Sequence, residues 1–75
     1  MTEIYEIDTK NLGFNTPEEK ILEEALNEIG KRRCIRSRGE GLTYVIETTM
    51  RLPQIEKEKI RKMNDVEDIR KTSKY

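Results

Sequence analysis

Apolar residues recur with a helical period over residues 17–29, and this pattern predicts the first helix. Thr16 is a favourable N-cap residue, Pro17 suits the first helical position, and Glu19 completes a capping box. Gly30 then ends the helix. The expected apolar stripe consists of Ile21, Leu22, Ala25, Leu26 and Ile29.

Apolar and polar residues alternate elsewhere, which predicts strands at residues 2–8, 32–38 and 42–52. Gly39 and Gly41 indicate a tight turn, so the second and third strands should form a hairpin. The residues expected to share the buried face are Tyr5 and Ile7 in the first strand, and Leu42, Tyr44, Ile46, Thr48, Met50 and Leu52 in the third.

A second helix over residues 53–65 and a last strand over residues 66–75 complete the predicted order β-α-β-β-α-β. Their apolar residues are Ile55, Ile60 and Met63 in the helix, and Val66 and Ile69 in the strand. This order is typical of an α+β, ferredoxin-like fold with a four-stranded antiparallel sheet and both helices on one face. We therefore expect residues 1–75 to form one domain.

The second face of the predicted sheet has no helix to cover it. Ile4, Val45 and either Cys34 or Ile35 should lie there, among polar residues. Because half-apolar sheet faces and free sheet edges often join subunits, we expect a homodimer.

Charge is balanced overall but divided along the chain. The 15 basic and 15 acidic residues cancel, yet residues 1–30 hold eight acids against two lysines. Residues 31–51 hold six basic residues against two acids, and residues 52–75 hold seven against five. Such a division favours contacts between elements, or between copies of the chain, as readily as contact with nucleic acid.

The composition argues against several functions. Histidine is absent, so the commonest general base and metal ligand is missing, and we expect no catalytic residues, no metal and no cofactor. No run of about 18 apolar residues is present, so we expect no membrane insertion. The single cysteine, Cys34, cannot form an internal disulfide, which favours a cytoplasmic location.

Five of the eight residues in the segment 31–38 are basic, and this segment is the main candidate for binding. Strict alternation would place Arg36 and Arg38 on one face with Cys34, and Arg33 on the other face with Ile35. The following Arg-Gly-Glu-Gly turn lacks the Lys-Ser/Thr ending and the helix of a phosphate-binding loop.

Three interpretations of this basic strand stay open. Arg33 could form an ordinary cross-strand pair with Glu47, as part of a structural or dimer role. Arg33, Arg36 and Arg38 could instead contact an anionic ligand or a protein partner. A small nucleic-acid-binding accessory protein is the remaining alternative, although few aromatic residues are present to stack on bases.

Three segments resemble ACT-type regulatory domains, in particular the soluble C-terminal domain of the MgtC family of membrane proteins. They read EEALNEIGKRRCIRSRG, TYVIETTMRL and EKIRKMNDVEDIRK. The resemblance implies a non-enzymatic regulatory domain that pairs side by side and binds a small effector near the loop after the first strand. In this chain that loop holds Asn11, Gly13 and Asn15 as the implied effector-binding residues.

Overall fold

The computed structural model describes residues 2–72, with the backbone alone of residue 38. It contains four strands and two helices in the predicted order. Their bounds are β1 (Glu3–Thr9), α1 (Pro17–Ile29), β2 (Lys31–Arg38), β3 (Gly41–Thr48), α2 (Gln54–Arg61) and β4 (Val66–Thr72). The expected last strand extends to residue 75, and its final three residues lie outside the described part of the chain.

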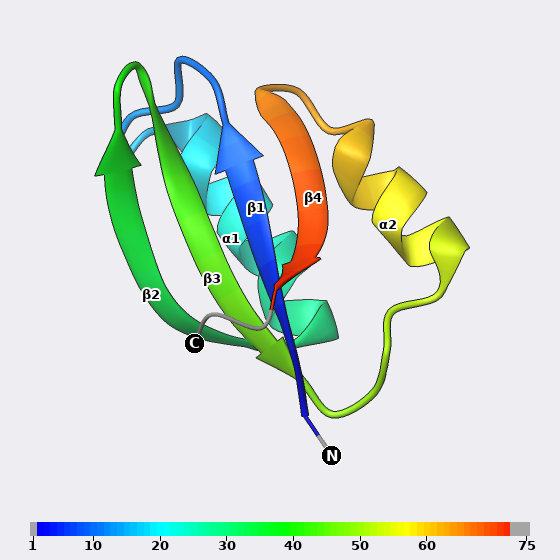
Figure 1. Ribbon diagram of the computed structural model, residues 1–75. Coiled ribbons are helices and arrows are strands. Elements are labelled where there is room, and N and C mark those ends of the chain that lie inside the picture. The colour runs from blue at the N-terminus through cyan, green and yellow to red at the C-terminus, as the bar shows by residue number, and fades with distance from the viewer. Residues whose placement is uncertain (1, 73–75) are drawn as a thin grey trace.

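The four strands form one antiparallel sheet in the order β2-β3-β1-β4. Each helix connects two strands that flank a third strand, so the fold is the ferredoxin-like α+β arrangement. Figure 1 shows α1 across one face of the sheet and α2 next to β4. We call the opposite face the open face, and its residues on the two central strands are Ile4, Glu6, Asp8, Thr43, Val45 and Glu47.

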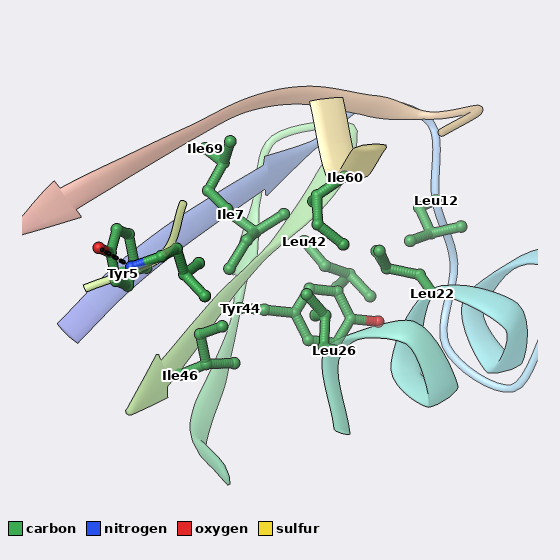
Figure 2. Close-up of a cluster of buried hydrophobic side chains, with 11 residues drawn as sticks. Tyr5, Ile7, Leu12, Leu22, Leu26, Leu42, Tyr44, Ile46, Ile60 and Ile69 are labelled. Atoms are coloured by element: carbon green, nitrogen blue, oxygen red, sulfur yellow. Dashed lines mark hydrogen bonds between the residues drawn. The ribbon is translucent and has the colours of Figure 1, made fainter. Parts of the chain in front are cut away.

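The core lies between the helices and the sheet (Figure 2). Leu22 and Leu26 of α1 and Ile60 of α2 belong to the same buried cluster, which places both helices on one side of the sheet. The sheet contributes Tyr5, Ile7, Leu42, Tyr44, Ile46 and Ile69. The fold and the buried face of the central strands are therefore as expected, except at the end of β3.

β3 ends at Thr48, earlier than expected, so the predicted strand to Leu52 is wrong. The Thr48 hydroxyl donates a hydrogen bond to the Met50 carbonyl at 2.6 Å, which stabilises a bend at this point. Met50 consequently lies 72% exposed instead of buried. Leu52 is buried although it lies in a loop, and its N–H donates a hydrogen bond to the Tyr5 hydroxyl at 2.9 Å.

Both helices have narrower apolar faces than expected. Ile21 is 61% exposed because α1 faces the sheet along the line of Leu22 and Leu26, and Ile21 lies beside that line. In α2, which ends at Arg61 instead of residue 65, Ile55 is 70% exposed. Burial of α2 therefore depends mainly on Ile60, in the last turn.

The predicted hairpin between β2 and β3 is confirmed. Gly39 has a φ of 52°, a left-handed conformation that favours glycine. A Cβ atom at Gly41 would overlap the carbonyl oxygen of Thr9. Next to it, the Thr9 hydroxyl accepts from the Leu42 N–H at 2.8 Å and donates to the Leu42 carbonyl at 2.7 Å, so it takes the place of a backbone pair between β1 and β3.

Candidate functional site

The basic strand β2 forms one edge of the sheet, and its inner side pairs with β3. Within residues 2–72, no strand pairs with its outer side. Because alternate residues of an antiparallel strand direct their N–H and C=O groups to opposite sides, about half of these groups in β2 point away from β3. The described side chains that are exposed along this strand are Lys31, Arg32, Arg33, Arg36 and Ser37.

A β-bulge in β2 changes the expected distribution of its arginines. Arg32 pairs with Ile46 and Cys34 pairs with Val45, which leaves Arg33 as the extra residue. The expected ion pair is confirmed, because Arg33 Nη1 lies 3.6 Å from Glu47 Oε1. Because Glu47 belongs to the open face, the Arg33 side chain lies on that face too. Ile35 packs against the core on the opposite face, so the expected grouping of Arg33 with Ile35 is wrong.

The other residues of β2 divide between the two faces. Arg32 reaches α1 on the helix side, where its Nη1 lies 3.3 Å from Glu23 Oε1. Ile35 packs against the core on that same side. Half-buried Cys34 and exposed Arg36 follow the open-face register, opposite Val45 and Thr43, so their expected grouping is confirmed.

The side chain of Arg38 lies outside the described residues, so its expected place beside Cys34 and its role as a contact residue stay predictions. The backbone of Arg38 is opposite Gly41, next to the turn.

The residues implied to bind an effector, in the loop between β1 and α1, have structural roles within that loop. Asn11 and Asn15 adopt φ values of 58° and 64°, a region that asparagine tolerates better than most residues. The carbonyl of Gly13 accepts a hydrogen bond from the Thr16 hydroxyl at 3.0 Å. A hollow at this end of the sheet is lined by Thr9, Lys10, Gly39, Glu40, Gly41 and Glu67, and includes none of the three residues implied to bind an effector.

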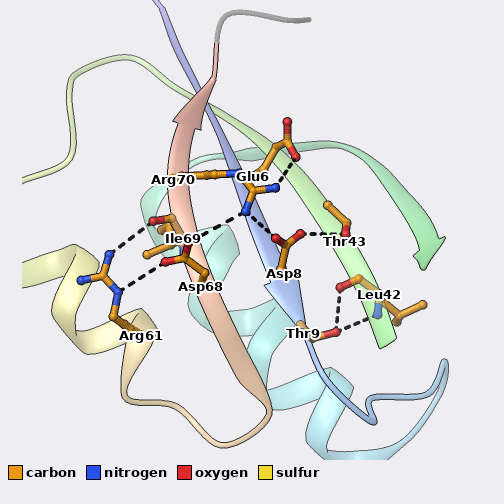
Figure 3. A network of polar contacts seen from close by, with 9 residues as sticks. All are labelled: Glu6, Asp8, Thr9, Leu42, Thr43, Arg61, Asp68, Ile69 and Arg70. Atoms are coloured by element: carbon orange, nitrogen blue, oxygen red, sulfur yellow. Dashed lines mark hydrogen bonds and ion pairs between the residues drawn. The ribbon is translucent and has the colours of Figure 1, made fainter. Parts of the chain in front are cut away.

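A polar network on the open face joins β1, β3 and β4 (Figure 3). Glu6 and Asp8 have side chains only 11% and 5% exposed, and the guanidinium of Arg70 lies against both. Its Nη2 is 3.2 Å from Glu6 Oε2, and its Nη1 donates to Asp8 Oδ2. Thr43 donates to Asp8 Oδ1 at 2.9 Å. The hydrogen bond to Asp8 is the main cause that raises the pKa of Arg70 above its ordinary value.

Sequence reasoning did not identify this network. The signal in the sequence is that Glu6 and Asp8 alternate with Tyr5 and Ile7, which places both carboxylates on the open face. The position of Arg70 opposite Glu6 depends on the pairing of β1 with β4, which are separated by most of the chain.

A second buried polar contact lies on the helix side of the sheet. The Tyr44 hydroxyl donates to Glu19 Oε2 at 2.6 Å, and both residues are buried. This hydrogen bond is the main cause that lowers the pKa of Glu19, whereas burial is the main cause that raises the pKa of Tyr44. The expected N-cap is present, since the Glu19 N–H donates to Thr16 Oγ1 at 3.1 Å. The Glu19 carboxylate, however, accepts from Asn15 N instead of Thr16 N.

The described residues contain no group of three or more carboxylate or cysteine side chains arranged to hold a metal ion. In the same part of the chain, no helix is long and apolar enough to cross a membrane. Among its aromatic side chains, Tyr5 and Tyr44 are buried, while Phe14 is exposed on the loop before α1.

Comparison with protein-family models, curated proteins and solved structures finds no match to this chain. The ferredoxin-like architecture therefore defines the class of the domain, and the resemblance to ACT-type regulatory domains stays a prediction. Because one fold serves many functions, the function of this domain depends on the residues of its surface.

Proposed function

We propose that this chain is a non-enzymatic protein-interaction domain that binds its partner through the free edge of β2. The observation that carries this proposal is the difference between the two edges of the sheet. On the β4 edge, α2 lies alongside the strand, and Arg61 Nη2 donates to the Ile69 carbonyl at 3.4 Å. β2 has eight residues, and no strand of the described chain pairs with its outer side.

The open face is a weaker candidate than the edge for a partner. Its apolar residues Ile4 and Val45 are already buried, at 9% and 0% exposure. Its acids Glu6 and Asp8 are engaged by Arg70. A partner would therefore gain little apolar area on this face, whereas β2 offers backbone hydrogen bonds that an added strand can satisfy.

The absence of catalysis is part of the proposal. The most buried carboxylates, which would be the natural candidates for acid–base chemistry, are used to hold the fold together. Glu19 accepts from Tyr44, while Asp8 accepts from Thr43 and Arg70. We also propose a cytoplasmic location, since the one free cysteine fits a reducing compartment.

Self-association into the expected homodimer is one form that this interaction could take. An effector at Asn11, Gly13 and Asn15 receives no support from the loop geometry, because backbone conformation accounts for both asparagines. Nucleic-acid binding is also less favoured, because Tyr5 and Tyr44 are buried and cannot stack on bases.

The proposal can be tested with an unbiased selection. The immobilised full chain is used to select from a random eight-residue peptide library, and enriched peptides are titrated into the ¹⁵N-labelled chain. We expect enriched peptides to shift the amide resonances of residues 31–38 and to protect some of them from hydrogen exchange. Absence of enrichment, or shifts confined to α1, α2 or the loop before α1, would contradict the proposal.

Sedimentation velocity from 10 μM to 1 mM protein measures the alternative of self-association in the same preparation. A dimer whose formation protects β2 amides would identify a second copy as the occupant of the edge. A dimer that leaves the β2 amides unprotected would place the interface elsewhere and contradict the proposal.

A further inference from the structure

Building on the proposed function, we infer that the partner of β2 is an extended acidic segment that adds to the sheet as a fifth strand. Five of the eight β2 residues are basic and none is acidic. A partner strand at this edge would therefore have its side chains close to several positive charges.

The ion pairs within the chain do not prevent the arginines of β2 from binding the acids of a partner. Glu23 and Glu47 lie 3.3 and 3.6 Å from Arg32 and Arg33, and Arg36 also takes part in an interaction within the protein. All four side chains of these pairs are 35–45% exposed, and pairs that face water contribute little free energy. A guanidinium also has five N–H donors, so Arg32 and Arg33 can each donate hydrogen bonds to a second carboxylate.

The same charges oppose pairing between two copies of β2. If two copies met antiparallel about an axis between Cys34 and Ile35, Arg33 would face Arg36 of the other copy. Like charges directly opposite on neighbouring strands destabilise the pair. An acidic strand would replace each repulsion with an attraction, and this charge complementarity selects it over a second copy.

The two faces of β2 also predict a pattern within the partner. On the open face, an added strand would lie beside Arg33 and Arg36. On the helix side it would lie beside Ile35, which already packs against the edge of the core. Because side chains of a strand alternate between faces, we expect acidic and apolar residues in turn, with the acids on the open face.

The probe is a capped eight-residue peptide that alternates glutamate and valine, titrated into the ¹⁵N-labelled full chain. We expect saturable shifts in β2 and an affinity about tenfold weaker in 500 mM than in 50 mM NaCl, because salt screens exposed charges. Two N-methylated versions of the peptide test strand addition. In one version every glutamate nitrogen is methylated, and in the other every valine nitrogen is methylated. Because alternate N–H groups of a strand face the neighbouring strand, only one of the two versions should lose binding.

A double variant tests the charges on the protein. Arg33→Gln with Arg36→Gln should weaken binding of the glutamate–valine peptide about tenfold. The matched control is Lys59→Gln with Lys62→Gln, which removes the same charge from α2 and its C-cap, beside the opposite edge, and should weaken binding less than twofold. If the arginine double variant fails to fold, the salt dependence and the two N-methylated peptides still decide the question.

Several results would overturn the inference. A lysine–valine peptide that binds β2 as tightly would show strand addition without a preference for acids, and the proposed function would stand. Equal binding of both N-methylated peptides, or tighter binding of a single-stranded oligonucleotide, would show attraction to negative charge without strand addition. Failure of every peptide to shift β2 would count against the proposed function as well.

Discussion

The hydrogen bond between Tyr44 and Glu19 offers a sharp test of how this small domain is stabilised. The substitution Tyr44→Phe removes only the hydroxyl, which donates to Glu19 Oε2 at 2.6 Å. Tyr44 is fully buried and Glu19 is 5% exposed, so water cannot readily replace the lost donor. The carboxylate also accepts a hydrogen bond from the Asn15 N–H, at 3.3 Å from Oε1.

Hydrogen bonds to charged groups contribute about 1.5–3 kcal/mol, and a buried acceptor left unpaired is costly. We therefore expect Tyr44→Phe to lower the free energy of unfolding by about 2 kcal/mol at pH 7. In a domain of this size, such a loss corresponds to a melting temperature about 8–16 °C lower.

The pH dependence follows from the two pKa shifts. The hydrogen bond lowers the pKa of Glu19 below its ordinary value of 4.5, so its stabilisation is present above that value and is lost as pH falls through the lowered pKa. The pKa of Tyr44 is raised above 10.0, so its stabilisation is present below pH 10.0 and is lost at higher pH. The deficit of the variant should be largest between these limits and shrink outside them.

Urea unfolding followed by far-UV circular dichroism measures this deficit at several pH values. The control is Tyr5→Phe, because Tyr5 is equally buried but its hydroxyl accepts from the neutral Leu52 N–H at 2.9 Å. We expect this control to lose about 1 kcal/mol, with the same loss at pH 3 and pH 7. A Tyr44→Phe deficit that is the same at pH 3 and pH 7, or smaller than that of the control at pH 7, would refute the reasoning.

Three further substitutions test other contacts by the same unfolding assay. Arg70→Gln should cost about 2 kcal/mol, because it removes a cation that donates to the buried Asp8 carboxylate. A loss below about 0.5 kcal/mol would show that Arg70 is an ordinary surface residue. Gly41→Ala should cost more than about 2 kcal/mol, because the added methyl overlaps the Thr9 carbonyl. Thr16→Ala should cost about 1 kcal/mol by removing the N-cap, while leaving the β2 resonances in place.

Local features of the chain were predictable because neighbouring residues determine them. The start of α1 depends on Thr16 and Pro17, and the β2–β3 turn depends on Gly39. The order of the elements followed from these signals and from the period of the apolar residues. With that order known, the rules for joining strands leave few sheet topologies.

Features that depend on tertiary contacts were not predictable in the same way. The bulge at Arg33 moves one residue out of strict alternation, and the sequence around Arg33 does not indicate a bulge. The exposure of Met50 results from a hydrogen bond that bends the chain after Thr48. The contact of Arg70 with Asp8 depends on strand pairing between the two ends of the chain.

The tertiary contacts also bring together the charges that are divided along the chain. Acids of the first 30 residues meet basic residues from both later segments, as in the contacts of Glu23 with Arg32 and of Asp8 with Arg70. These pairs lie on the helix side and on the open face, and the pair of Glu23 with Arg32 offsets one of the five basic charges of β2. The edge can therefore keep a positive character that opposes pairing with its own copies while it favours an acidic strand.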